Sequence, residues 1–533
     1  MTAKHDHRTV LTAFASLRLA EPTAAAINYY GNSISRAELD DLSERLAQVW
    51  ANHVRQGDRV AVALQNTPLF AIALLATWKL EAVLVPVSPM LKSAELTALL
   101  ADSGAQIMLA HPEMIEAIAA AVDQLEQPPA LFWSSASDLA GDLDAPWSST
   151  TEATPMPAQG APVSEALNGQ QGSARGTPPA QDGLALLTYT SGTTGPSKGA
   201  MLTHANIANQ AFITPDCFGL KPGDTMLTLA PFFHITGLCM HLAIGLGNGL
   251  PMVMTYRFDA HHVSKLIEHY RPSFTVGTIT AFIALAEHAR ASQEAQEALG
   301  AMTSSFSGGA AVPAAVIERY EKQFGVYIRN GYGLTESSSV CIAVPTGQRA
   351  PVDAGSGATS IGRPLPGVTV AVIADDGTEV PAGVPGEIVV QGPQVGSGYW
   401  NRTDETANTF RPDGLHTGDI GFIDQHGWIY VVDRKKDLII VSGYKVWPRD
   451  VEDVLYQHAS VAEAAVVGIP DSYRGESVAA FVVPRPGTSL DPDELNRHCR
   501  ERLSAYKCPR RYEIVSALPK SASGKILRRL LRG

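Results

Sequence analysis

Cysteine is scarce in this sequence, and the cysteines that are present lie far apart. Positions 217, 239, 341, 499 and 508 form no C-x-x-C pair and have no histidine at the spacing of a zinc site. An odd number of scattered cysteines is typical of reduced thiols in a cytosolic protein. We therefore predict a cytoplasmic location.

Long hydrophobic runs are missing as well. The most apolar stretch covers residues 69–78 and meets Lys79 and Glu81, whereas a helix that spans a bilayer needs about 20 apolar residues. Residues 1–8 are polar and His-rich, and no apolar signal-peptide core follows them. We expect a buried helix at 69–78, no transmembrane segment and no secretion.

Positive charge is in the minority. The chain has 41 Lys+Arg against 53 Asp+Glu and a formal charge of −12, and its only dense basic run is Arg528, Arg529 and Arg532. Nucleic-acid binding proteins usually carry a basic patch that matches the phosphate backbone. Nucleic acid is therefore excluded as an expected partner.

What the chain does have is length and a globular composition. It contains 533 residues, of which 45% are hydrophobic and 18% charged. At roughly 100–200 residues per domain, this length predicts about three or four structural units. A small binding module is excluded.

The spacing of apolar residues predicts an α/β fold. Leu39, Leu42 and Leu46 recur at helical spacing, a strand pattern follows at 59–64, and another follows the apolar helix at 82–87. Strands that alternate with helices favour a parallel sheet. This alternation resumes after a segment rich in Pro, Ala and Ser and continues to about residue 375.

Changes in composition and in the expected secondary structure along the chain predict its domains. Short strands bounded by Gly and Pro, such as 387–391 and 428–432, indicate a β-rich subdomain. We predict a large N-terminal domain (1–434) with two α/β sheet subdomains and this β-rich subdomain, and a small, mobile α+β domain (435–533). Residues 145–181 are predicted to be a flexible linker or surface loop.

The strongest local motif follows the predicted strand 184–189. Residues 188–200 combine hydroxyl side chains, glycines and Lys198, which together suit a phosphate cradle. Lys198 precedes Gly199, so the motif is not a Walker A loop. The alternative is a polar loop without a ligand.

Other motifs are weak when each is taken alone. In 330–336 two glycines flank Tyr332, and Thr335 and Glu336 offer oxygen ligands for phosphate and Mg²⁺, but G-x-G also marks ordinary turns. His234 by itself predicts a packed histidine. The carboxylate and arginine clusters at 417–419 and 433–437 are also common in ordinary turns. The glycine-hinged loop with Lys525 is also typical of a basic C-terminal tail.

Together and in this order, the motifs resemble the adenylate-forming superfamily of acyl- and aryl-CoA synthetases, luciferase-like enzymes and adenylation domains of peptide synthetases. The segments that carry the resemblance are YTSGTTGPSKG (189–199), PFFHITG (231–237), SGGAAVP (307–313), NGYGLTE (330–336), GEIVVQGPQVGSGYW (386–400), TGD (417–419), DRKKDLIIVSGYKVWPRDVE (433–452) and PKSASGKILRR (519–529). They cover essentially the whole chain.

The resemblance implies a ligase with ATP, Mg²⁺ and coenzyme A as cofactor and co-substrates. A small carboxylic acid would react with ATP to give acyl-AMP and pyrophosphate, and the thiol of CoA would then displace AMP. The prediction for partners also allows a homodimer.

The resemblance also implies roles for individual residues. The residues that would wrap the β- and γ-phosphates are Ser191, Gly192, Thr193, Thr194, Gly195 and Lys198. Those that would contact adenine, ribose and the α-phosphate are Gly309, Ala310, Tyr332, Gly333, Thr335, Asp419 and Arg434. Glu336 and Thr190 would bind Mg²⁺. The catalytic set would be Lys525, Thr335, Glu336 and His234.

Movement of the small domain is implied in the same way. Lys436 occupies the family's hinge position, and rotation about it would withdraw Lys525 and bring Ser442 and Gly443 to a pantetheine tunnel.

The residues of the expected acyl pocket favour an apolar acid. No Asp or Glu occurs between Met226 and Phe258, although the ammonium group of an amino-acid substrate would need a buried carboxylate. The implied pocket residues are His234, Gly237 and Thr280. Where the family usually has a Val-Pro-Thr-like turn, this chain has residues 277–282 without proline. The absence of acidic residues from the expected pocket predicts a fatty or other aliphatic acid.

Three alternatives stay open from the sequence. An aryl-acid CoA ligase of the coumarate or benzoate type shares every motif, and Tyr256, Phe274 and Phe282 would permit it. A catalytically silent scaffold protein would have no reason to keep the lysines, acids and arginine of the motifs intact. Oxidation of the adenylate with light emission would need a special substrate.

Overall fold

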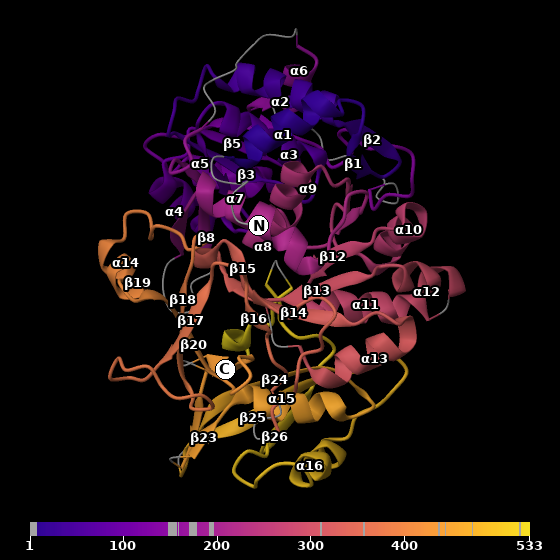
Figure 1. Cartoon of the computed structure of the whole chain (residues 1–533), viewed down its shortest axis with the longest axis vertical. Coiled ribbons are helices and arrows are strands. Elements are labelled where there is room, and N and C mark those ends of the chain that lie inside the picture. The colour runs from indigo at the N-terminus through magenta and orange to yellow at the C-terminus, as the bar shows by residue number, and fades with distance from the viewer. Residues whose placement is uncertain are drawn as a thin grey trace.

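The structure is a computed structural model, and it describes residues 8–147, 157, 159–169, 179–190, 197–290, 292–309, 312–354, 358–434, 437–442, 444–471, 473–521 and 524–532. Its first sheet lies in the upper part of Figure 1 and its fourth at the bottom, and most strands of the second and third sheets lie between them at overlapping heights.

The first sheet has the strand order β7-β6-β5-β3-β4-β8-β9 and is parallel except for the β8–β9 pair. Its strands are β3 (Arg59–Ala63), β4 (Val83–Pro86), β5 (Ile107–Ala110), β6 (Ala130–Trp133), β7 (Ala161–Pro162), β8 (Leu184–Thr190) and β9 (Lys198–Thr203). The helices of this region are α1 (Val10–Ala20), α2 (Arg36–Trp50), α3 (Pro68–Lys79), α4 (Ser93–Ser103), α5 (Ile115–Val122), α6 (Val163–Leu167) and the 3₁₀ turn η1 (Pro112–Met114).

Helix α3 is the apolar helix that the sequence predicts at 69–78. Pro68 opens it at a position where the missing N–H costs no hydrogen bond. Every residue from there to Trp78 is buried, and the indole of Trp78 donates to the Ala185 carbonyl at 3.1 Å. The prediction of a buried helix is confirmed. Among the described residues, no helix is long and apolar enough to cross a membrane.

The second sheet has the order β16-β15-β14-β13-β12-β10-β11-β1-β2 and is parallel in its centre. Its strands are β1 (Ala25–Tyr29), β2 (Asn32–Ser35), β10 (Met226–Thr228), β11 (Met252–Met254), β12 (Phe274–Gly277), β13 (Ser304–Gly308), β14 (Ile328–Leu334), β15 (Ser339–Ala343) and β16 (Arg363–Pro364). The helical segments beside it are α7 (His204–Phe218), α8 (Ile235–Gly237), the π-helical η2 (Leu238–Ala243), α9 (Ile244–Asn248), α10 (Ala260–Tyr270), α11 (Ile279–Ala289), α12 (Gln293–Gly300), α13 (Ala314–Phe324) and η3 (Thr335–Ser337).

The third sheet is antiparallel and supplies the predicted β-rich subdomain. Its elements are β17 (Thr369–Ile373), β18 (Gly386–Gln391), α14 (Thr403–Thr409), β19 (Phe410–Arg411), β20 (Gly414–Ile423) and β21 (Ile429–Arg434).

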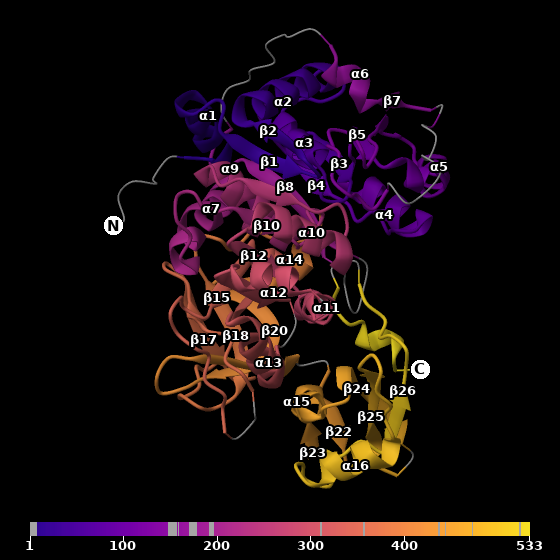
Figure 2. The same ribbon diagram turned by 90° about the vertical axis from the view of Figure 1, so that its right-hand side faces the viewer.

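The fourth sheet and its helices make up the small α+β part. The elements are β22 (Ile439–Val441), β23 (Tyr444–Val446), α15 (Pro448–Gln457), β24 (Val461–Asp471), β25 (Gly475–Pro484), α16 (Pro492–Arg500), β26 (Arg511–Ile514) and η4 (Arg528–Leu530). Arg485 of this part pairs with Glu287 of α11 at 3.0 Å. Figure 2 shows the last segment of the chain, in yellow, reaching up toward α11. The predicted α/β architecture with these four parts is confirmed.

The segment 145–181, predicted as a linker or loop, contains regular structure in its described part. Strand β7 extends the first sheet through the pair Phe132–Ala161, and Val163 of α6 is buried. The Arg45 guanidinium of α2 donates to the carbonyls of Leu167 and Gly169 at 3.1 and 2.8 Å. Composition missed these elements because each is too short for its apolar residues to show a period.

Histidines buried in this fold predict a loss of stability in acid. His204, on the edge of the Trp78 ring, has a pKa lowered to about 4 by burial, and burial likewise lowers the pKa of His241 to about 4. Such a group binds a proton more readily in the unfolded chain, so stability falls as the pH drops from about 6.5 toward 4. Between pH 6.5 and 5 each group can remove up to about 2 kcal/mol.

We expect His204→Gln to lose less stability than the wild type between pH 7 and pH 5, in urea unfolding followed at both pH values. The exposed His53→Gln serves as the matched control and should follow the wild type. An unchanged pH dependence in His204→Gln would contradict the assignment.

Candidate active site

The loop predicted to cradle phosphate lies between two paired strands. Thr190 ends β8 and Lys198 begins β9, and the two residues face each other in the antiparallel register. The loop residues Ser191, Gly192, Thr193, Thr194 and Gly195 lie outside the described residues, as do Ala310, Lys436 and Gly443. The strands therefore define both ends of the loop.

A segment after β18 is bound to the strand that leaves this loop. The Met201 N–H donates to the Gly398 carbonyl at 2.9 Å, and the Trp400 N–H donates to the Gly199 carbonyl at 2.8 Å. Tyr399 lies between these two bonds, with its ring centroid 5.3 Å from the Lys198 ammonium. This close approach fixes the phenol beside the predicted phosphate site.

Tyr399 also holds the carboxylate of Glu336, which is 9% exposed. Its hydroxyl donates to Glu336 Oε1 at 2.5 Å, and the Gly396 N–H donates to the Glu336 carbonyl at 2.8 Å. Burial, followed by the Glu336 charge, raises the pKa of the Tyr399 phenol well above its ordinary value. The phenol therefore stays protonated, and the carboxylate is oriented by a fixed donor.

Tyr399 is a site residue to which the sequence alone gave no role, although it stands in the segment 386–400 that carries the resemblance. The available signal was its place in Gly-Ser-Gly-Tyr-Trp, where small residues allow a backbone to approach a neighbouring strand. Its contact with Glu336, 63 positions away in the chain, could not be read from that pattern.

A second polar pair joins β14 to β20. The Tyr332 hydroxyl donates to Asp419 Oδ2 at 2.6 Å, and Asp419 is 4% exposed. Burial and then the Asp419 charge raise the pKa of Tyr332. Asp419 faces Arg434 across the β20–β21 register; the Arg434 side chain lies outside the described part. The structure thus places predicted adenine and ribose contacts side by side.

Lys525 enters a small cavity of about 40 Å³ in the second sheet. Predicted site residues that line this cavity are His234, Gly309, Gly333, Thr335 and Lys525. Gly309 has φ +79°, and a Cβ there would lie 2.7 Å from Lys525 Cε. Only glycine leaves room for the lysine at this point.

The loop that presents Lys525 rests on the turn that lacks the family's proline. A Cβ on Gly524 would lie 3.1 Å from Thr278 Oγ1 and 3.5 Å from Thr280 Oγ1. The two threonine hydroxyls are 2.9 Å apart and hydrogen-bonded. The structure therefore brings the predicted pocket residue Thr280 to the base of the lysine loop.

His234 is a neutral imidazole in this environment. Burial and then the positive charge of Lys525 lower its pKa to about 3. Its Nδ1 accepts from the Thr236 N–H at 3.3 Å, which places the ring proton on Nε2. The side chain can therefore donate a hydrogen bond but carries no charge at neutral pH.

Two other predicted residues lie away from this cavity. Gly237 packs against backbone, because a Cβ there would lie 2.1 Å from the Pro231 carbonyl oxygen, and it is not among the residues that line the cavity. Ser442 is exposed between β22 and β23, two strands that Figure 2 shows in the lower part of the small domain, away from the upward-reaching yellow segment.

Two family descriptions match most of the chain. The family described as AMP-binding enzyme matches residues 18–400, and the AMP-binding enzyme C-terminal domain matches residues 450–525. The chain belongs to the AMP-binding enzyme family. The resemblance to adenylate-forming enzymes is thereby confirmed.

Relatives of this AMP-binding enzyme include several acid:CoA ligases. A long-chain-fatty-acid–CoA ligase of Bacillus subtilis is 36% identical and is aligned over 96% of this chain and 91% of its own. A feruloyl-CoA synthase of an Amycolatopsis species is 35% identical over 95% of each chain. The crystal structure of ATP-bound MatB from Rhodopseudomonas palustris is 28% identical, with a TM-score of 0.84 and 98% of each chain covered.

We expect Tyr399→Phe to weaken ATP binding about tenfold, because a charged hydrogen-bond acceptor loses its donor in a desolvated site. Calorimetric titration of the variant with ATP in the presence of Mg²⁺ measures the change. Tyr473→Phe, at an 88% exposed position, is the control. An unchanged dissociation constant in Tyr399→Phe would show that the bond to Glu336 does not serve the nucleotide site.

Proposed function

We propose that this AMP-binding enzyme is an ATP-dependent acyl-CoA ligase that activates an apolar, aliphatic carboxylic acid. It converts the acid to acyl-AMP and then to the CoA thioester, releasing pyrophosphate and AMP. The observation that carries the proposal is the placement of Lys525 beside His234 in a cavity that Thr335 and Gly309 also line. The names of the relatives support CoA as the acceptor.

The cavity supplies the charges and donors that adenylation needs. A carboxylate oxygen forms a bond to the α-phosphorus of ATP as the bond to the pyrophosphate oxygen breaks. The Lys525 ammonium would bridge the carboxylate and the α-phosphate, and the Nε2–H of His234 would donate to the carboxylate. Fixed donors aimed at developing charge are worth about 10²–10³ in rate each.

Magnesium is the metal that the donor set suits. Carboxylate and hydroxyl oxygens are ligands that Mg²⁺ prefers, and we assign Glu336 and Thr190 to it together with the phosphates of ATP. Glu336 is held in place by Tyr399. When bound, the ion would neutralise phosphate charge. Lys198, with the loop residues Ser191 to Gly195, would bind the same phosphates.

The remaining nucleotide contacts follow from the paired side chains. Asp419 and Arg434, opposite each other in β20 and β21, would hold the ribose. Tyr332, with Gly309, Ala310 and Gly333, would contact adenine, and the bond from Tyr332 to Asp419 would keep ring and carboxylate in register.

Thioester formation requires the small domain to move. The CoA thiol loses its proton, its sulfur bonds to the acyl carbon, and the bond from that carbon to AMP breaks. We propose a boundary between residues 434 and 435, a hinge at Lys436, and rotation that brings Ser442 and Gly443 to the pantetheine arm. The contacts that would have to break include Arg485 to Glu287.

Apolar side chains around the cavity favour a hydrocarbon substrate. Ile235, Val276 and Val340 line it beside Phe218 and Phe306, and we assign His234, Gly237 and Thr280 to the acyl end. An aryl acid is the second candidate, favoured by the stacked rings of Phe218 and Phe306, whose centroids are 3.7 Å apart.

We also propose a cytoplasmic location, which the cysteines support because none of them, all within the described ranges, forms a disulfide. A homodimer stays a prediction that gel filtration can test.

We expect AMP and pyrophosphate release with ATP, Mg²⁺ and CoA to be strongest with linear aliphatic acids in a panel of linear, branched and aryl acids. Omission of CoA should stop thioester formation and leave acyl-AMP on the enzyme. A preference for aryl acids would promote the second candidate. If the protein binds ATP but releases AMP and pyrophosphate with none of these acids, the proposal is overturned.

We expect Lys525→Ala to slow acyl-AMP formation by about 10²–10³ and to leave thioester formation from preformed acyl-AMP nearly unchanged. Rapid-quench assays of each half-reaction separate the two steps. Lys520→Ala, in the same loop and paired with Glu463, is the control and should retain both rates. Equal losses in both half-reactions would contradict a role for Lys525 in adenylation alone.

A further inference from the structure

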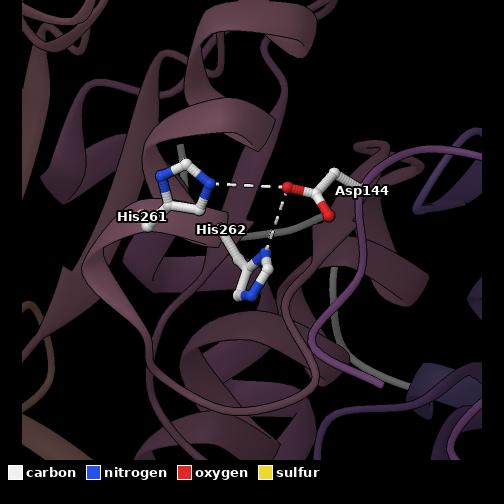
Figure 3. Close-up of side chains that lie close together, drawn as sticks. All are labelled: Asp144, His261 and His262. Carbon is white, nitrogen blue, oxygen red and sulfur yellow. Dashed lines mark ion pairs between the residues drawn. The ribbon is translucent and has the colours of Figure 1, made fainter. Parts of the chain in front are cut away.

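A cluster of two histidines and an aspartate lies outside the site described above. Figure 3 shows the Asp144 carboxylate between the imidazoles of His261 and His262, which stand in the first turn of α10. His261 Nε2 is 3.4 Å and His262 Nδ1 is 3.8 Å from the same oxygen, Oδ2. One potential ligand atom from each residue lies within 4.8 Å of the others.

We propose that Asp144, His261 and His262 bind a divalent transition-metal ion of the Zn²⁺ or Co²⁺ type. Ligand atoms about 2.0–2.2 Å from a tetrahedral zinc ion are about 3.3–3.6 Å from one another, and the two distances from Asp144 Oδ2 to the imidazole nitrogens, 3.4 and 3.8 Å, are close to this range. Two imidazole nitrogens and one carboxylate oxygen suit zinc and cobalt, whereas Mg²⁺ and Ca²⁺ prefer oxygen alone. Three protein ligands leave the fourth position to water.

Ion pairs between Asp144 and the two histidines explain this arrangement less well than a bound metal does. His262 Nδ1 is shielded from solvent and makes no hydrogen bond within the described ranges, although a buried polar atom without a partner costs about 1–3 kcal/mol. A bound metal would give this nitrogen a partner.

Charges around the cluster also favour a cation. The Asp259 carboxylate accepts from the backbone N–H groups of His261 and His262 at 3.0 and 3.1 Å, and so lies beside the same turn. The Lys265 ammonium is paired with Glu268 at 2.9 Å. The acidic groups near the imidazoles therefore exceed the basic ones.

The site would join two segments that are distant in sequence. Asp144 belongs to residues 134–147 (the strap), which follow β6 and run along β1 and β2. In this segment the Leu143 N–H donates to the Tyr30 carbonyl at 3.0 Å. Trp147, three residues on, lies with its ring centroid 4.9 Å from that of Tyr30 and 5.7 Å from that of Tyr256.

Tyr256 is in turn part of the wall of an open cleft of about 790 Å³ between the first two sheets. A metal between Asp144 and α10 would hold the strap in place three residues before Trp147, whose ring packs against Tyr256 of this wall. Its binding should therefore raise the thermal stability of the folded protein.

The test uses the untagged full-length protein, treated with EDTA, freed of EDTA, and titrated with Co²⁺ in the absence of ATP. We expect one equivalent of Co²⁺ to give the intense visible absorption of a four- or five-coordinate site, Zn²⁺ to displace it, and the melting temperature to rise. His262→Ala should lose the absorption, and Asp144→Asn should weaken binding by more than about tenfold.

Two matched controls make the result specific. His269→Ala removes another histidine of α10 and should retain the cobalt site. His5→Ala/His7→Ala removes the closely spaced histidine pair near the N-terminus and should also retain it. Each variant is first shown to melt cooperatively without metal.

Absence of saturable Co²⁺ absorption in the wild type would overturn the proposal. So would unchanged binding in His262→Ala and Asp144→Asn, or loss of binding in His5→Ala/His7→Ala, since the ion would then be held elsewhere.

Discussion

The hydrogen bond from Tyr399 to Glu336 is the contact on which the arrangement of the nucleotide site depends. Glu336 lies in η3 between β14 and β15 of the second sheet, and Tyr399 follows β18 of the third. The neighbours of Tyr399 are bonded to β9 of the first sheet. Because the acceptor is a desolvated carboxylate, loss of this donor would leave a buried charge with one hydrogen bond fewer. The three sheets are therefore held in the relative positions that the predicted phosphate and metal ligands require.

Lys525 completes this arrangement from a different part of the chain. The cavity that receives it is narrow, Gly309 lies close to its side chain, and Gly524 before it lies close to Thr278 and Thr280. The positive charge and the burial together keep His234 uncharged. A single loop of the small domain thus sets both the electrostatics and the shape of the cavity, so movement of that domain would change both at once.

Much of the fold is predictable from local pattern. The helix at 69–78 and the helix Pro448–Gln457 follow from apolar spacing and from a proline at the helix start, where its missing N–H costs no hydrogen bond. The pattern fails at 145–181, where β7 and α6 depend on a sheet edge and on Arg45, neither of which leaves a periodic trace in so few residues. Such elements owe their existence to contacts made elsewhere in the chain.

The sequence by itself determined the family and the chemical types present at the site, since hydroxyls, glycines, lysines and acids stand in a recognisable order. Only the tertiary structure decided which of them meet. The partners of Glu336, of Asp419 and of Asp144 lie 63, 87 and more than 100 positions away. The physical reason is that a charged group interacts with the partner that lies near it in space, and that position is set by the packing of sheets whose strands come from distant parts of the chain.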